Sequence, residues 1–189
     1  MLISKKDYNI KSLYYTIRSA VEADAEALSE LRLQIDGETE NLDREPGEAF
    51  IDSQGFQSII NADSESARNI FLVAETNGRL IGFSRCAGND LKRFRHKVEF
   101  GVGVLKEFWG YGIGKKLLQE SISWADENDI KKMTLNVMEA NENARRLYEK
   151  LGFEVEGILK DDKLLSDGNF YNMIVMGRIN KQNRGINNG

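Results

Sequence analysis

The chain has 189 residues, of which 41% are hydrophobic and 30% charged. These proportions are typical of a globular domain with a buried core and exclude an intrinsically disordered chain. The 26 lysines and arginines stand against 30 aspartates and glutamates, a net charge of −4, which argues against a nucleic-acid partner. One cysteine and one histidine are too few for an intramolecular disulfide or a Cys/His zinc site, so no metal is predicted.

No segment is long and apolar enough to predict a membrane span, and the N-terminal residues contain no apolar leader. Together with the single cysteine, Cys86, these features predict a cytoplasmic protein without a membrane partner. Pro46 is the only proline, and no Pro- or Ser-rich linker divides the chain. We therefore expect one domain over residues 13–179, preceded by a lead-in of residues 1–12 and followed by a polar tail of residues 180–189.

Hydrophobic periodicity predicts both strands and helices in the first half of the chain. Asp24 is expected to cap the first helix, whose apolar positions run from Ala27 to Ile35 at helical spacing. Asn77-Gly78 predicts a tight hairpin turn between two strands. The elements expected in this half are a strand at Leu13–Arg18, helices from Asp24 and over Glu48–Ala62, and strands at Ile70–Glu75, Leu80–Cys86 and Val98–Val104.

In the second half, helix-like and strand-like periods alternate. Gly152 is expected to end the last helix as its C′ glycine. The elements expected here are a helix over Ile113–Glu127, a strand over Met133–Val137, a helix over Ala144–Leu151, and strands at Phe153–Leu159 and Phe170–Ile179. The order β-α-α-β-β-β-α-β-α-β-β predicts an α/β (α+β) fold, a mixed sheet of about seven strands with about four helices on its faces.

Three glycines at alternate positions, Gly110, Gly112 and Gly114, lie between a predicted strand and a predicted helix. Glycines at such a turn let the backbone approach a ligand closely, and the N–H groups at the helix start can bind phosphate. The dinucleotide fingerprint would need a glycine at Lys115, and the P-loop sequence is absent, so neither site is predicted. By itself the pattern is also typical of a plain tight turn.

A second motif follows the glycine turn. Residues 141–153 match Asn-x-x-Ala-x-x-Leu-Tyr-x-x-x-Gly-Phe and resemble the signature of the GNAT superfamily of acyl-CoA-dependent N-acetyltransferases. The turn at Trp109–Gly114 then resembles that family's pyrophosphate loop, Arg/Gln-x-x-Gly-x-Gly/Ala, with tryptophan where Arg or Gln is usual. The resemblance covers about residues 70–179 and looks closest to the branch of ribosomal-protein and polyamine acetyltransferases. It implies a mostly antiparallel central sheet and acetyl-CoA as the cosubstrate.

The resemblance implies that acetyl-CoA binds along the strand Val98–Val104 and at the glycine turn. Its pantetheine arm would pair with backbone groups of Val102 and Val104, and its diphosphate would meet the amides of the turn. Asn141 is also expected as a helix N-cap, and Lys115 is equally consistent with a solvated side chain. The residues expected to contact the cofactor are Val102, Val104, Trp109, Gly110, Gly112, Ile113, Gly114, Lys115, Asn141 and Asn143.

Two residues are candidate catalytic groups. The resemblance implies Tyr148 as the acid that protonates the departing thiolate of CoA, and a phenol, whose ordinary pKa is about 10, suits that step. The alternative for Tyr148 is a core aromatic. Glu99 is the candidate general base for the amine, and the alternatives are an exposed strand carboxylate at this position or His96 as the base.

The resemblance implies an enzyme that transfers the acetyl group of acetyl-CoA directly to a primary amine, and the presence of both candidate catalytic residues favours this interpretation. The alternative is a non-catalytic acyl-CoA-binding or regulatory module of the same fold. Six acids and one base between Asp36 and Glu48 indicate either a solvated loop or a wall for a cationic amine, such as a polyamine or a basic peptide. The sequence leaves open the identity of the acceptor, the use of other acyl groups and a homodimer.

Overall fold

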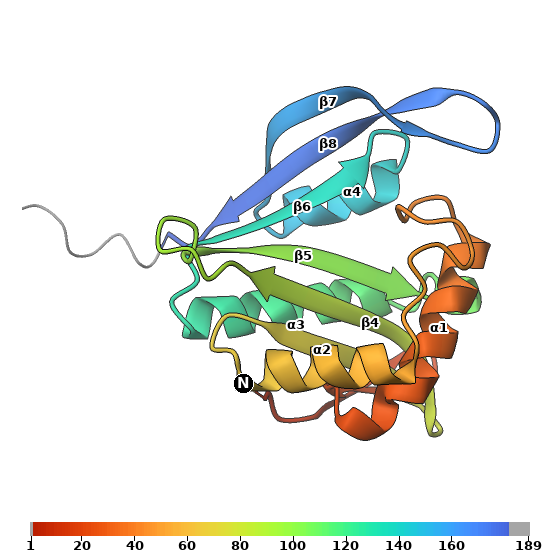
Figure 1. Cartoon of the computed structure of the whole chain (residues 1–189), viewed down its shortest axis with the longest axis vertical. Helices are drawn as coiled ribbons and strands as arrows, with labels where there is room; N and C mark the ends of the chain where they lie inside the picture. The colour runs from red at the N-terminus through yellow and green to blue at the C-terminus, as the bar shows by residue number, and fades with distance from the viewer. Residues whose placement is uncertain (1, 182–189) are drawn as a thin grey trace, which may run out of the picture.

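The computed structural model describes residues 2–181, which form one β-sheet covered by helices (Figure 1). Residues 182–189 of the predicted polar tail lie outside the described range. The strands are β1 (Lys6–Ile10), β2 (Leu13–Ser19), β3 (Ile70–Thr76), β4 (Arg79–Gly88), β5 (Lys97–Val104), β6 (Lys132–Met138), β7 (Glu154–Leu164) and β8 (Phe170–Ile179). The helices are α1 (Ala25–Glu38), α2 (Ser53–Glu65), α3 (Ile113–Glu127) and α4 (Glu142–Lys150), with short 3-10 turns at Glu22–Asp24 and Lys106–Phe108. Within residues 2–181, none of the helices has the length and apolar character needed to cross a membrane.

The eight described strands follow the order β1-β2-β3-β4-β5-β6-β8-β7 across the sheet, and every neighbouring pair is antiparallel except β5 and β6. These two strands are parallel and pair only where Lys97–Glu99 faces Lys132–Thr134. Beyond that point they diverge, as Figure 1 shows. The divergence opens the sheet near its centre and leaves backbone groups of both strands without a ladder partner.

Helices cover both faces of the sheet. Helix α3 packs on one face, where Ser121 Oγ lies 3.3 Å from Ser84 Oγ of β4. Its apolar positions Ile113, Leu117 and Trp124 are all buried, as the helical spacing predicts. Helices α1 and α2 cover the opposite face (Figure 1). This architecture confirms the expected α/β class, with four helices on a mostly antiparallel sheet.

Strand β1 lies inside residues 1–12, where the sequence predicts only a lead-in, and it brings the sheet to eight described strands rather than about seven. It is an edge strand, and its polar sequence gives little strand signal. Lys6 Nζ and Tyr8 Oη hold it in place by donating to the two carboxylate oxygens of Glu120 on α3, each at 2.6 Å. The two-residue turn Lys11-Ser12, with positive φ at both positions, then leads into β2.

Helix α2 begins after Asp52, later than the predicted Glu48. Gly47 and Ala49 both have positive φ, which a right-handed helix cannot accommodate. The helix begins where the Asp52 carboxylate takes the N-cap position and accepts the Gly55 N–H at 2.8 Å. The residues before it therefore form an irregular loop, part of which lines a cavity.

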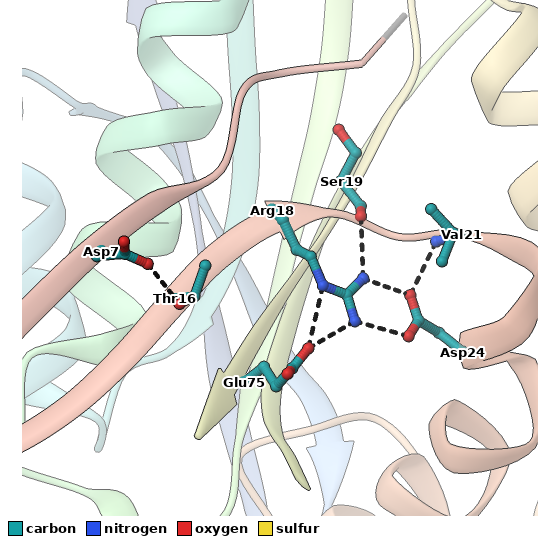
Figure 2. A network of polar contacts seen from close by, with 7 residues as sticks. All are labelled: Asp7, Thr16, Arg18, Ser19, Val21, Asp24 and Glu75. Atoms are coloured by element: carbon teal, nitrogen blue, oxygen red, sulfur yellow. Dashed lines mark hydrogen bonds and ion pairs between the residues drawn. The ribbon is translucent and has the colours of Figure 1, made fainter. Parts of the chain in front are cut away.

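Arg18 joins three elements at the start of α1 (Figure 2). Its guanidinium donates to both carboxylate oxygens of Asp24, at 2.7 and 2.8 Å, and to Glu75 of β3 at 2.7 Å. The Asp24 carboxylate also accepts the Val21 N–H at 2.8 Å, so it does not bond to the helix amides as a capping side chain would. Burial opposes the charge on Asp24, but these hydrogen bonds outweigh burial and lower the pKa of the carboxyl. The network ties β2, β3 and α1 together.

Candidate active site

The glycine turn between β5 and α3 has left-handed backbone at two positions. The φ angle is +85° at Gly110 and +73° at Gly112, so both positions strongly favour glycine. Gly112 is the N-cap of α3, and the first intrahelical hydrogen bond runs from the Lys116 N–H to the Gly112 carbonyl at 2.9 Å. The N–H groups of residues 113–115 therefore have no acceptor inside the helix. They form a backbone site suited to an anion.

Trp109 braces this turn against the end of β5. Its indole Nε1 donates to the Val104 carbonyl at 2.8 Å, and the residue is 46% exposed. The side chain that stands where Arg or Gln is usual in the resembled family therefore links the turn to the strand.

Lys11, in the turn between β1 and β2, also lies against the glycine turn. Its Nζ is 3.8 Å from the place where a Cβ on Gly110 would stand. Sequence reasoning missed this cation because residues 1–12 carry no motif, and because its neighbour in space is about 100 positions away in the chain.

Alternate residues of β5 turn their backbone toward the opening between β5 and β6. Gly82 of β4 lies opposite Val104, and the Leu105 N–H donates to the Ile81 carbonyl at 3.0 Å. In an antiparallel ladder this register places Val104, and with it Val102, in non-hydrogen-bonded pairs with β4. Their N–H and C=O groups therefore turn away from β4 toward the side of β6. The Val104 carbonyl already accepts the Trp109 indole N–H, so the groups left for the predicted cofactor contact are the Val104 N–H and both backbone groups of Val102.

Helix α4 carries the second motif. Asn141 is its N-cap, and its Oδ1 accepts the Ala144 N–H at 3.3 Å, so the predicted cap is confirmed. Asn143 is exposed in the first turn. Tyr148 is 9% exposed, with its ring centroid 6.0 Å from that of Phe153, and burial raises the pKa of its hydroxyl to about 12. A phenol with this pKa stays protonated at neutral pH.

A cavity of about 600 Å³ lies where β5 and β6 diverge, beside the loop that follows α1. Glu99, Gly101 and Val102 of β5 line it, together with Thr134 of β6. A Cβ on Gly101 would have no neighbouring atom within 4 Å, so the glycine leaves this wall open. The structure thus brings Glu99 and Val102 together in one cavity, whereas Tyr148 and the glycine turn do not line it.

Three cations line the same cavity, and sequence reasoning assigned a role to none of them. Arg85 donates from Nε and Nη2 to Asp63, at 2.6 and 2.9 Å. Arg44 donates from the same two nitrogens to Asp36, both at 3.1 Å. The third cation is Lys97, whose Nζ lies 5.0 Å from the centroid of a phenylalanine ring. No local motif marks the two arginine pairs, whose partners are 22 positions apart for Arg85 and 8 positions apart for Arg44.

Among the acids between Asp36 and Glu48, the cavity is lined by Asp43 alone. Glu38 accepts a backbone N–H from the turn after β5 at 2.7 Å, and Glu40 accepts one from the β7–β8 connection at 2.9 Å. The acidic run therefore fastens its loop to the rest of the fold and does not form a continuous acidic wall. In the part of the chain described here, no group of three or more His, Cys, Asp or Glu residues is arranged to hold a metal ion.

Sequence comparisons point to one family. Residues 32–153 match the Acetyltransferase (GNAT) family. The chain is 30% identical over 140 residues to the uncharacterised N-acetyltransferase YhfO of Bacillus subtilis, a match that covers 73% of this chain and 89% of that protein. It is 31% identical over 121 residues to the ribosomal protein bS18-alanine N-acetyltransferase of Haemophilus influenzae, covering 64% of this chain and 78% of that protein.

Solved structures agree with the sequence comparisons. A GNAT-family acetyltransferase from Streptococcus pneumoniae matches with a TM-score of 0.85 at 28% identity, covering 88% of this chain and 99% of that one. The putative acetyltransferase yncA from Salmonella typhimurium, solved with acetyl-CoA, matches with a TM-score of 0.76 at 25% identity, covering 87% of this chain and 93% of that one.

Proposed function

Because this chain belongs to the acetyltransferase (GNAT) family and is an acetyl-CoA-dependent N-acetyltransferase, we propose that it acetylates a primary amine held beside Glu99 by direct transfer. The observation that carries the proposal is the cavity at the divergence of β5 and β6, which has Glu99 and Val102 on its walls. In this proposal Glu99 takes a proton from the amine, and Tyr148 gives one to the departing thiolate.

The glycine turn suits the diphosphate of acetyl-CoA. Gly110 and Gly112 carry no side chain, and the N–H groups of residues 113–115 have no acceptor inside α3. The N–H and C=O of Val102 and the N–H of Val104 turn toward the strand opening, where the pantetheine arm would pair like an added strand. When bound, acetyl-CoA supplies a thioester whose acetyl group is already activated toward an amine. The further cofactor contacts proposed are Trp109, Ile113, Gly114, Lys115, Asn141 and Asn143.

Glu99 is the base in this proposal. A primary amine is mostly an ammonium ion at neutral pH and must lose a proton before it can attack a thioester. Glu99 is exposed on the cavity wall, and among the described residues its carboxylate has no ion-pair partner. It can therefore accept the proton directly or through water. His96, the alternative base, is exposed outside the cavity lining, which favours Glu99.

Tyr148 has the properties of a proton donor. Its pKa, raised to about 12 by burial, keeps the hydroxyl protonated across the neutral range. Such a weak acid gives up its proton only when strong negative charge develops nearby, as it does on a departing thiolate. The position of Tyr148 in the second motif and its burial support this role.

A purely cationic amine is not the acceptor that the cavity favours. Glu38 and Glu40 are engaged in hydrogen bonds away from it, and Asp43 Oδ1, on its wall, lies 3.5 Å from Lys163 Nζ. The Haemophilus influenzae relative is named for an alanine of a ribosomal protein, which makes an α-amine a candidate acceptor for this chain.

Release of free thiol from acetyl-CoA tests the proposed function. The panel contains α-amino acids, peptides with free N-termini, polyamines and an aminoglycoside, and mass spectrometry identifies the acetylated product. We expect thiol release with at least one of these classes. Binding of CoA without thiol release from any amine would contradict the proposal and support the non-catalytic module.

Two expectations about the cellular context remain predictions. Cys86 is a buried free thiol, which suits the reducing cytoplasm, and fractionation of cells tests that location. Sedimentation equilibrium tests the homodimer, since a dimer would have twice the mass of the chain.

A further inference from the structure

The wall of the acceptor cavity presents more positive than negative groups. The carboxylates that pair with its two arginines, Asp36 and Asp63, have side chains only 3% and 2% exposed and do not line the cavity. A ligand would therefore meet the guanidinium groups and not their buried partners. The charged residues that line the cavity are Arg44, Arg85, Lys97, Asp43 and Glu99.

Each arginine is held along one edge only. Nε and Nη2 of Arg85 donate to the two oxygens of Asp63, and the same nitrogens of Arg44 donate to those of Asp36. Within residues 2–181, the Nη1 group of neither arginine donates to another side chain, so each retains N–H donors for a ligand. A guanidinium anchored in this way is already oriented when a second anion arrives.

Lys97 adds a positive charge without an acidic partner. Its ammonium lies 5.0 Å from the centre of the Phe94 ring, and it has no ion pair with a described carboxylate. Lys97 and Glu99 are two positions apart on β5, so their side chains leave the same face of the strand. A cation and a carboxylate that have no ion-pair partner among residues 2–181 thus stand next to each other on the cavity wall.

Arg85 and Glu99 are also neighbours on that face. Arg85 lies opposite Gly101 in the ladder, and Ala87 lies opposite Glu99, so Arg85 and Glu99 are diagonal partners. The Cβ atoms of such partners are roughly 7 Å apart. An amine at Glu99 and an anionic group at Arg85 would therefore be separated by only a few bonds.

We propose, on the basis of the function proposed above, that the acceptor is a small amine that also carries an anionic group, as an α-amino acid does. Glu99 faces the ammonium group of this acceptor, and the anionic group lies among Arg85, Arg44 and Lys97. A polyamine brings only positive charge to this wall and is disfavoured.

Matched acceptors test the proposal on the unmodified protein. Each set contains an α-amino acid, its amide and the amine that lacks the carboxyl group. Spermidine is added as a polyamine. The rate of thiol release gives kcat/KM for each compound. Charge-assisted hydrogen bonds predict a kcat/KM at least about 10-fold higher for the amino acid than for its amide. The amino group of the amide is less basic than that of the amino acid and loses its proton more easily. Ease of deprotonation would therefore favour the amide and cannot explain a preference for the amino acid.

The outcomes separate this proposal from the function on which it rests. If the amide, the amine or spermidine is used as well as the amino acid, the anionic-acceptor proposal is overturned and the acetyltransferase stands. If no compound of any set releases thiol, the anionic-acceptor proposal is overturned, and the proposed function fails only if the peptides and the aminoglycoside of the wider panel release no thiol either.

Variants of the wall give a second test. Lys97→Gln removes a charge without disturbing a buried ion pair, and Arg85→Lys keeps a positive partner for Asp63 but removes the second donor edge. Each should lower the preference for amino acid over amide by about 5-fold or more. Lys92→Gln, at an exposed lysine outside the cavity, is the matched control and should keep the preference. Thermal unfolding verifies that each variant is folded, and an unaltered preference in both folded wall variants would overturn the proposal.

Discussion

Ile10, the last residue of β1, lies against Gly112 of the glycine turn, where a Cβ atom would stand 3.2 Å from Ile10 Cδ1. This is closer than ordinary van der Waals contact, so packing as well as φ favours glycine at this position. The same hairpin is attached to α3 through Glu120, which accepts hydrogen bonds from Lys6 and Tyr8. The N-terminal strand therefore supports the turn that we expect to hold the diphosphate of the cofactor.

Gly112→Ala should weaken both CoA binding and folding. The left-handed φ of +73° costs an L-residue about 1 to 2 kcal/mol, and the new methyl group must also displace Ile10. Gly78→Ala is the matched control, because φ there is +76° and no atom lies within 4 Å of the added Cβ. Calorimetry with CoA and urea unfolding measure the two effects. If Gly112→Ala binds CoA as tightly as Gly78→Ala does, the glycine turn is not the diphosphate site.

Lys11→Ala should weaken CoA binding by about 5- to 10-fold at low salt, because its ammonium lies beside Gly110 in that turn. The loss of affinity should become smaller as the salt concentration rises, because Lys11 is exposed and its attraction to CoA is screened. The screening length is about 8 Å at physiological ionic strength. Isothermal titration at two salt concentrations measures it. Lys5→Ala, an exposed lysine just before β1, is the control and should bind CoA normally. Equal affinities for the two variants would show that Lys11 does not meet the cofactor.

Tyr148→Phe should lower kcat by about 100- to 10,000-fold with little change in KM, because a general acid acts only in the transition state. With the pKa of Tyr148 raised to about 12 by burial, the parent enzyme should lose no activity from ionisation of this group below about pH 11. Tyr171→Phe removes an exposed hydroxyl that donates to Asp167 and should be nearly fully active. A kcat within about 2-fold of the parent would return Tyr148 to a packing role.

Glu99→Gln should lower kcat/KM for the amine by about 100-fold at neutral pH, because the ammonium group loses its proton acceptor. The deficit should narrow at high pH, where more of the amine is already deprotonated. Steady-state rates from pH 7 to pH 10 measure this change. Glu154→Gln, at an exposed strand carboxylate outside the cavity, is the control. A deficit that stays constant with pH would argue for a positioning role and against a base.

Asp24→Asn should lower the free energy of unfolding at pH 7 by about 2 kcal/mol, because Arg18 keeps its charge and its Glu75 partner but loses the carboxylate of Asp24. The pKa of Asp24 is lower in the folded than in the unfolded state, so the ionised carboxylate stabilises the fold. This contribution is complete above the pKa of the unfolded chain, near 4, and is lost as the pH falls through the pKa of the folded state. The difference between parent and variant should therefore shrink below about pH 4. Urea unfolding at several pH values measures it.

Asp7→Asn is the control for this experiment, since Asp7 accepts a hydrogen bond from Thr16 at an exposed site drawn in Figure 2. It should cost less than about 1 kcal/mol at any pH. An Asp24→Asn deficit that does not depend on pH would contradict the electrostatic account of the Arg18 network.

Features that depend on residues close together in the chain were predictable from the sequence alone. The Asn77-Gly78 turn has positive φ at both positions, as its residue types require. The apolar face of α3 and the Asn141 cap of α4 also follow local rules of periodicity and hydrogen bonding. The glycine turn was recognised as a motif for the same reason, because its conformation is set by the glycines themselves.

Tertiary structure alone decided the features that depend on distant partners. Lys6 and Tyr8 of strand β1 reach Glu120, at separations of 114 and 112 positions, and no local pattern signals those contacts. The same holds for the cavity wall, where Arg85 is held by Asp63, 22 positions away. The acidic run shows the same effect, because Glu38 and Glu40 bond to two different parts of the fold. Periodicity and turn chemistry act over a few residues, whereas sheet order and ion pairing are settled only when the whole core packs.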